Sequence, residues 1–252
     1  MAFDLARRYK ADVLETDVRI SSDGVPVLHH DAKLDRTTNG SGFVSDLSLK
    51  ELKSLDAAYH FKNLTGEAYR DRGISILTLD EFLDEYQDIA MSIEIKHPDT
   101  DFAKKVATTV KQTGRSDNIT LASFHAKIIH AVRQTTPEIT TTTTRDETMD
   151  LYMSRRRFSR WMNNLHDRLF EANDKGNATT YPRTLQIPPS FKFGPFTINL
   201  TTADFIDYLH QQNLSVNYWT INSAEKMVEL SQNGADGLIT DRIDIASKIF
   251  DL

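Results

Sequence analysis

Residues 13–20 of the chain read VLETDVRI, a segment in which apolar and charged side chains alternate. Successive side chains of a β-strand point to opposite faces. Leu14 and Val18 therefore share one face, while Glu15 and Asp17 share the other. The alternation predicts a strand that buries its apolar face under helices and turns its carboxylates toward a polar space.

A second segment, MSIEIK at residues 91–96, repeats this pattern. Ile93 and Ile95 fall on one face, and Glu94 and Lys96 fall on the other. A charged face is also ordinary for an exposed edge strand, and that alternative stays open for either segment alone. Two strands with the same charged face favour the mouth of a parallel α/β barrel, where barrel enzymes hold their functional groups.

Strand-like and helix-like segments alternate along the rest of the chain, which predicts parallel β-α-β units. The strand-like segments are residues 13–20, 91–96, 119–124, 139–144, 184–188, 215–220 and 237–241. The helix-like segments are residues 78–88, 101–114, 126–135, 146–175, 202–212, 223–233 and 243–250. The predicted fold is therefore α/β, a TIM (β/α)8 barrel of which seven strands are counted. The length of 252 residues suits this fold, which typically takes about 250 residues.

We expect residues 1–252 to form a single domain, because no linker or low-complexity segment interrupts the alternation. A small insertion after the first strand, at about residues 32–77, is longer than a usual loop between a strand and a helix. The chain begins inside a helix-like segment with no N-cap residue ahead of it. Together with the count of seven strands, this predicts that the first barrel strand is missing ahead of Met1.

Composition excludes several classes of function. The chain has no cysteine, which excludes disulfides and thiolate metal sites. Its net charge of -6 gives no electrostatic reason to bind nucleic acid. No apolar run approaches the roughly 20 residues of a membrane-spanning helix. We therefore expect a cytoplasmic protein whose partner is a small molecule, and the sequence leaves its oligomeric state open.

The carboxylates of Glu15, Asp17 and Glu94 are expected to converge at the barrel mouth. Carboxylates that converge repel one another, and burying a charge without a partner is costly. A hard divalent cation with oxygen ligands, Mg²⁺ or Ca²⁺, would resolve both costs. The stretch DGVPVLHHD at residues 23–31 ends with His30 and Asp31, just past a short strand-like segment. A histidine there could donate a proton to a leaving alkoxide. A lone His-Asp pair in a loop is more often structural.

These residues lie in a longer stretch, LETDVRISSDGVPVLHHDAKLDRTTNGSGFVSDLSLKELKSLD, that strongly resembles the glycerophosphodiester phosphodiesterase family. The specific spacing is E-x-D-V, D-G-x-P-V, H-D, L-D-R-T-T and G-x-V. The resemblance continues through the E-x-K of IEIKHP, the SF of LASF, V-x-x-W-T-x-N and GADGLITD. It covers nearly the whole chain.

The resemblance implies a TIM barrel that hydrolyses glycerophosphodiesters to glycerol 3-phosphate and an alcohol. At the matching positions it implies Glu15, Asp17 and Glu94 as metal ligands and His30 as a catalytic residue. Substrate-binding roles fall on Lys96, Phe124 and Trp219, although plain core packing is an equal alternative for the two aromatic residues.

The chain departs from the family pattern in one place. The H-R-G motif of the family's first strand and the P-E-N-T segment after it are absent. One hypothesis is a truncated sequence whose parent is an active enzyme; the other is a genuine short form, which would be poorly active. The alternatives to a glycerophosphodiester phosphodiesterase are a barrel enzyme like phospholipase C or D, and a non-catalytic metal-binding remnant without the first catalytic histidine.

Overall fold

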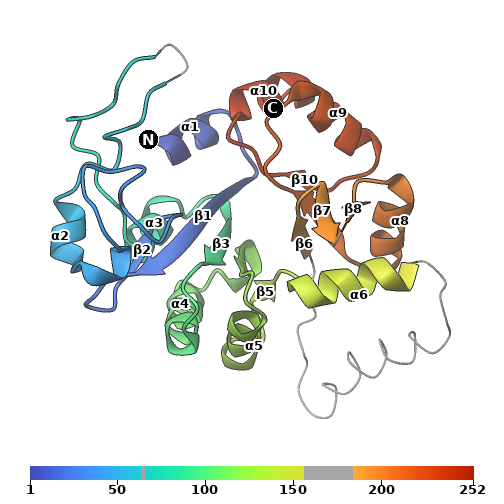
Figure 1. Cartoon of the computed structure of the whole chain (residues 1–252), viewed down its shortest axis with the longest axis horizontal. Coiled ribbons are helices and arrows are strands. Elements are labelled where there is room, and N and C mark those ends of the chain that lie inside the picture. The colour runs from blue at the N-terminus through green and yellow to red at the C-terminus, as the bar shows by residue number, and fades with distance from the viewer. Residues whose placement is uncertain (64–65, 156–183, 194) are drawn as a thin grey trace.

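Seven parallel strands follow one another in the computed structural model, which describes residues 1–63, 66–155, 184–193 and 195–252 (Figure 1). They are β1 (Val13–Ile20), β3 (Ala90–Ile95), β4 (Ile119–Ala122), β5 (Thr140–Thr141), β6 (Thr184–Ile187), β9 (Ser215–Tyr218) and β10 (Gly237–Leu238). The ladders run β1-β3-β4-β5 and β6-β9-β10, and a parallel bridge between Thr142 and Thr184 joins the two sets. The predicted seven-strand count is confirmed.

The set has two ends, because no ladder joins β1 to β10 among the described residues. The short strand β2 (Pro26–Leu28) pairs antiparallel with the last residues of β1 and so belongs to the excursion that follows it. The missing first strand and the single-domain boundary of residues 1–252 stay predictions.

Helices cover the outer face of the sheet (Figure 1). They are α1 (Ala2–Arg8), α3 (Leu79–Glu85), α4 (Thr100–Gln112), α5 (Ala126–Thr135), α6 (Arg145–Arg155), α8 (Ala203–Gln211), α9 (Ala224–Gln232) and α10 (Ile243–Phe250). The predicted helix at residues 146–175 is confirmed only as far as Arg155, since the remainder lies outside the described residues. No helix in the described ranges is long and apolar enough to span a membrane.

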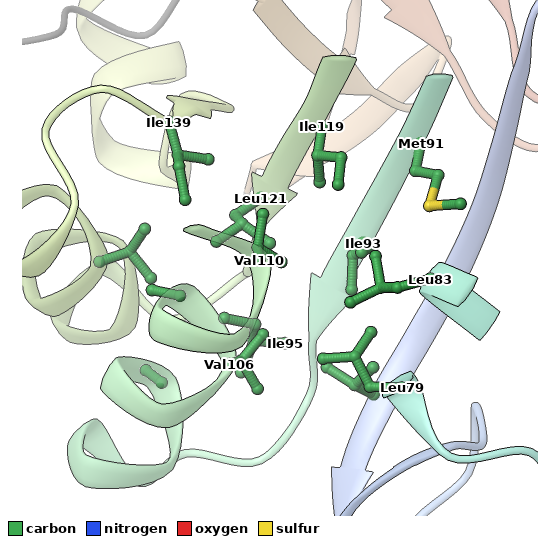
Figure 2. Close-up of a cluster of buried hydrophobic side chains, with 14 of the residues drawn as sticks. Leu79, Leu83, Met91, Ile93, Ile95, Val106, Val110, Ile119, Leu121 and Ile139 are labelled. Atoms are coloured by element: carbon green, nitrogen blue, oxygen red, sulfur yellow. The ribbon is translucent and has the colours of Figure 1, made fainter. Parts of the chain in front are cut away.

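The apolar face of β3 packs against the helices that follow and precede it (Figure 2). Ile93 and Ile95 are fully buried with Val106 and Val110 of α4, which lie four residues apart on one helix face. The side chain of Asp99 begins α4 by accepting a hydrogen bond from the Phe102 amide at 2.7 Å. Each such buried aliphatic side chain contributes about 1.5–3 kcal/mol. Because Ile93 and Ile95 are buried under the helices, Glu94 must point to the opposite face of β3.

The insertion at residues 32–77 contains a 3-10 turn at Val44–Asp46 and the helix α2 (Leu49–Lys53). A reciprocal capping box between Ser48 and Glu51 begins α2. A separate apolar cluster holds the insertion together; its buried members are Val27, Leu34, Val44, Leu52 and Ile76.

Polar side chains also meet on the inner face of the strands, next to the carboxylates of Glu15, Asp17 and Glu94. Gln186 of β6 donates a hydrogen bond of 2.7 Å to the hydroxyl of Ser92 on β3, which joins strands that are not neighbours. The Asn217 amide of β9 donates to the Thr184 hydroxyl at 3.0 Å. Gly237 leaves room for this amide, because an added Cβ would lie 2.3 Å from the Asn217 Oδ1.

We expect Gly237→Ala to destabilise the protein by about 1–3 kcal/mol, the usual cost of overpacking a core. Urea denaturation would measure this loss. The same substitution in an Asn217→Ala background should cost much less, since the clashing amide is gone. Equal losses in both backgrounds would show that another contact restricts this position.

A hairpin after β6 was not predicted from the sequence. Strands β7 (Ser190–Phe193) and β8 (Phe196–Asn199) pair antiparallel. The hairpin forms a two-stranded sheet of its own and contributes to the pocket described below. It lies beside β6 and β10 in the view of Figure 1.

Candidate metal centre and active site

Three carboxylates meet where β1 and β3 run side by side. In this parallel ladder Asp17 is the register partner of Glu94. Glu15 precedes Asp17 by two residues and therefore lies on the same face of β1. One ligand oxygen from each of Glu15, Asp17 and Glu94 lies within 4.8 Å of the other two. Oxygen donors this close suit a hard divalent cation such as Mg²⁺ or Ca²⁺. Of the carboxylates and imidazoles that the structure describes, this is the one group with such spacing.

The surroundings of these carboxylates disfavour three negative charges. Burial, together with the charges of Asp17 and Glu94, raises the pKa of Glu15 to about 8. Burial also raises the pKa of Glu94, although Lys96 opposes this. A bound cation would stabilise the charged forms of these three carboxylates, which otherwise repel one another. Their oxygen atoms therefore fit a divalent metal ion.

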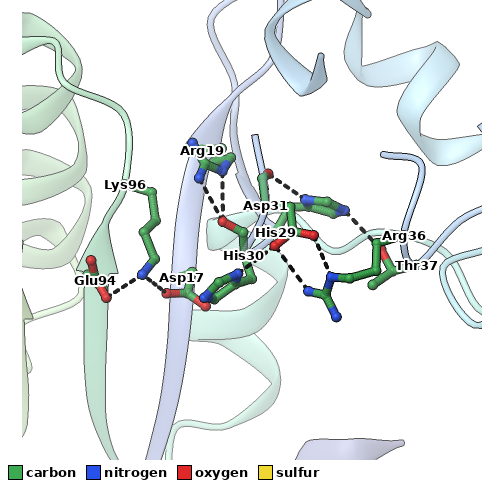
Figure 3. A network of polar contacts seen from close by, with 9 residues as sticks. All are labelled: Asp17, Arg19, His29, His30, Asp31, Arg36, Thr37, Glu94 and Lys96. Carbon is green, nitrogen blue, oxygen red and sulfur yellow. Dashed lines mark hydrogen bonds and ion pairs between the residues drawn. The ribbon is translucent and has the colours of Figure 1, made fainter. Parts of the chain in front are cut away.

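Lys96 adds a positive charge between Asp17 and Glu94 (Figure 3). Its ammonium lies 2.6 Å from Glu94 Oε2 and 3.2 Å from Asp17 Oδ1. Burial disfavours the charged amine, but these two ion pairs outweigh it and raise the pKa of Lys96. The ammonium also lies 5.4 Å from the centre of the Phe124 ring, which in turn meets Trp219 edge-on at 5.6 Å.

His30 reaches the same space from the loop after β2. The Arg19 guanidinium, on the face of β1 that carries the carboxylates, donates two hydrogen bonds of 2.9 and 2.7 Å to the His30 carbonyl oxygen (Figure 3). The imidazole Nδ1 lies 2.7 Å from Asp31 Oδ1. Hydrogen bonds from Arg36 hold the pKa of the Asp31 carboxyl well below its usual range. The carboxylate therefore orients a ring that is otherwise 61% exposed.

His29, the neighbouring residue, has a structural role. Its Nδ1 donates to the Asp31 carbonyl oxygen at 2.9 Å, and its Nε2 lies 3.2 Å from the Thr37 hydroxyl. Burial lowers the pKa of His29. Both ring nitrogens are thus engaged in holding the loop that presents His30.

A pocket of about 440 Å³ opens beside the carboxylates, a volume in the range of small-molecule sites. All seven residues predicted for the site line it: Glu15, Asp17, His30, Glu94, Lys96, Phe124 and Trp219. Others that line it were not predicted, among them Thr142, Thr143, Thr144, Arg145, Thr148, Met149, Gln186, Phe191, Lys192 and Leu200. The dipeptide Gly194-Pro195, a turn signal, could have indicated the hairpin that carries Phe191 and Lys192.

Residues 1–245 match the model of the glycerophosphoryl diester phosphodiesterase family. The chain belongs to this family. YhdW of Bacillus subtilis (strain 168) is 30% identical over 256 residues, which cover 98% of this chain and 89% of that protein. The glycerophosphodiester phosphodiesterase of Caldanaerobacter subterraneus is 27% identical, covering 95% of this chain and 86% of its own length. The resemblance to glycerophosphodiester phosphodiesterases is confirmed.

Solved structures of the glycerophosphodiester phosphodiesterase family share the fold. A domain of this family from Mycobacterium tuberculosis superposes with a TM-score of 0.75 at 19% identity, covering 99% of this chain and 92% of that one. A glycerophosphodiester phosphodiesterase from Agrobacterium tumefaciens gives 0.72 at 23% identity, with 97% and 90% coverage. These family members are TIM-barrel enzymes, so the predicted α/β barrel class is confirmed.

Metal affinity is expected to rise with pH up to about 8. Glu15 must lose its proton to act as a ligand, so affinity should grow about tenfold per pH unit below its pKa and level off above it. Calorimetric titration with Mg²⁺ and with Ca²⁺ at pH 6, 7, 8 and 9 would measure this. A flat profile over that range would contradict the assignment.

The Glu15→Gln variant tests the raised pKa of Glu15 through the stability of the protein. Because the folded-state pKa of Glu15 lies above its ordinary value of 4.5, the folded protein holds this proton longer than the unfolded chain. Without metal, Glu15 therefore lowers stability as pH rises from about 4.5 to 8. The glutamine variant should melt higher than the unmodified protein at pH 8, with little difference at pH 4.5.

Proposed function

We propose that this chain is a metal-dependent phosphodiesterase that hydrolyses glycerophosphodiesters to glycerol 3-phosphate and an alcohol. The observation that carries the proposal is the convergence of Glu15, Asp17 and Glu94 within 4.8 Å, in one pocket with Lys96 and His30. Membership of the glycerophosphoryl diester phosphodiesterase family supports the same substrate class. A phosphodiesterase of Oleispira antarctica with the same fold, at a TM-score of 0.68 and 21% identity, has been solved with the product sn-glycerol-3-phosphate.

Glu15, Asp17 and Glu94 would hold Mg²⁺ or Ca²⁺, which when bound supplies a Lewis acid for phosphoryl oxygens. Lys96 adds a fixed positive charge within 3.2 Å of two of these ligands, where it can attract the diester's phosphate. The edge-on pair of Phe124 and Trp219 forms an apolar wall of the pocket and limits the positions open to the substrate's carbon chain.

His30 is suited to carry the proton of the leaving alcohol. The imidazole lines the pocket, while its Nδ1 is engaged by Asp31, which leaves Nε2 to face a substrate oxygen. A positioned imidazole of this kind contributes about 10² to 10⁴ in rate as a general acid or base.

The test is release of glycerol 3-phosphate, followed with glycerol-3-phosphate dehydrogenase as the coupling enzyme. Glycerophosphocholine, glycerophosphoethanolamine and glycerophosphoinositol are offered as substrates, with and without chelator. We expect release that stops on chelation and returns when Mg²⁺ or Ca²⁺ is added in excess. Release that chelation does not change would refute the metal, and failure with all three substrates would refute the substrate class.

A further inference from the structure

The pocket continues beyond the metal centre toward the strands that follow β4. Neighbouring strands lie about 4.8 Å apart, so β5 lies about 10 Å along the sheet from β3. Arg145, the first residue of α6, follows β5, and Lys192 lies on β7 of the hairpin after β6. Both line the pocket. This distal end of the pocket is therefore separate from the carboxylates yet continuous with them.

Neither of these two cations is paired with a carboxylate in the part of the chain that the structure describes. Glu147, two residues after Arg145, is already engaged: it accepts hydrogen bonds from the Arg133 guanidinium at 2.6 and 3.2 Å and from the Thr144 amide at 2.7 Å. Lys192 is exposed on its strand. Two positive charges without a carboxylate partner among the described residues thus line the pocket of a chain whose net charge is negative.

The other charges of the pocket are compensated locally. Lys96 is paired with Asp17 and Glu94. Lys96 and a divalent ion together would balance the three carboxylates. The charges of Arg145 and Lys192 consequently exceed what the single negative charge of a phosphodiester requires, and they leave a place for one more anionic group.

Resting on the proposed function, we propose that Arg145 and Lys192 select diesters whose alcohol part carries a second phosphate. With the diester phosphate at the metal centre, the alcohol part extends along the pocket toward β5 and the hairpin. Phe191, Met149 and Leu200 supply apolar walls there. The guanidinium of Arg145 offers planar paired donors for phosphate oxygens, and Lys192 adds a second charge on a flexible stem.

The test compares two substrates that differ by one phosphate: glycerophosphoglycerol, and glycerophosphoglycerol with a terminal phosphate on its alcohol part. In the unmodified protein kcat/KM should be about tenfold higher for the phosphorylated substrate, the size expected of two partly exposed charge contacts. Arg145→Gln combined with Lys192→Gln should bring this ratio close to one, mainly by lowering kcat/KM for the phosphorylated substrate. Arg8→Gln combined with Lys50→Gln removes the same two charges outside the pocket and should leave the ratio unchanged.

Two outcomes would overturn the inference. Equal kcat/KM for both substrates in the unmodified protein would show that no second phosphate is recognised. An equal loss on both substrates in the double variant would show that the two cations act on the reacting phosphate.

Calorimetric titration of both diesters into metal-loaded protein that carries His30→Gln, which slows turnover, measures binding directly. A tenfold preference for the phosphorylated diester that disappears in the Arg145/Lys192 double variant would support the inference even if no diester is hydrolysed. No preference, or a preference that the double variant keeps, would overturn it. Failure of the proposed function alone would instead show as binding without release of glycerol 3-phosphate.

Discussion

Replacement of Glu94 by glutamine is expected to lower both divalent-metal affinity and turnover by about 10³-fold or more. The amide keeps the shape of the side chain but removes one of three anionic ligands within 4.8 Å of one another. Metal ions supply several kcal/mol of charge stabilisation in such sites, and about 4 kcal/mol corresponds to a factor of 10³. Lys96 also loses its closer ion-pair partner, at 2.6 Å. Titration calorimetry with Mg²⁺ and Ca²⁺ and release of glycerol 3-phosphate would measure the two losses.

Glu229→Gln is the matched control for this substitution. Glu229 lies exposed on α9 and pairs with Lys226, away from the pocket. Its replacement should change neither metal affinity nor turnover. A Glu94→Gln protein that folds normally and binds metal within threefold of the unmodified protein would remove Glu94 from the ligand set.

Replacement of His30 by glutamine should reduce kcat by about 10² to 10⁴ and leave metal affinity unchanged. Glutamine can accept or donate a hydrogen bond near Asp31, but it cannot carry a proton at neutral pH. Because His30 is 61% exposed, its loss should cost little stability. Single-turnover rates and titration calorimetry on the same preparation would separate the chemical step from metal binding.

His60→Gln supplies the control for His30, since His60 is an exposed histidine of the insertion that does not line the pocket. It should leave kcat unchanged. If the His30 variant kept more than a tenth of the unmodified kcat, proton transfer by this imidazole would be excluded as a main contribution, and His30 would be reduced to shaping the pocket wall.

The site residues could be predicted because strand periodicity fixes which side chains share a face. In β1 the side chains of Leu14, Thr16 and Val18 are buried, while Glu15 and Asp17 are only partly so. The same rule placed Glu94 and Lys96 together. Strand periodicity does not predict the register between two strands. The structure shows that register, in which Asp17 is paired with Glu94. That pairing is what brings carboxylates of two strands to one place.

The distal part of the pocket was not predictable by the same rule. The run of threonines at residues 140–144 indicates a buried strand, and these side chains are indeed mostly buried. Only Thr140 and Thr141 form the β5 ladder, however, and Thr142 to Thr144 line the pocket instead. A β-branched run carries no signal for where its ladder ends. The Gly194-Pro195 dipeptide after β7 signals a turn, but strand alternation does not place Lys192 beside the pocket.

The two hydrogen bonds from Arg19 to the His30 carbonyl have a further consequence for how the protein can be assayed. Glu15, Asp17 and Arg19 are alternate residues of a single strand, so a slip of β1 by one residue against β3 would turn all three toward the helices at once. Metal ligands and the anchor of the histidine loop would be lost in the same event. Misfolded molecules of this kind would have no intermediate activity. The specific activity of a refolded preparation should therefore count the molecules in which β1 is correctly aligned.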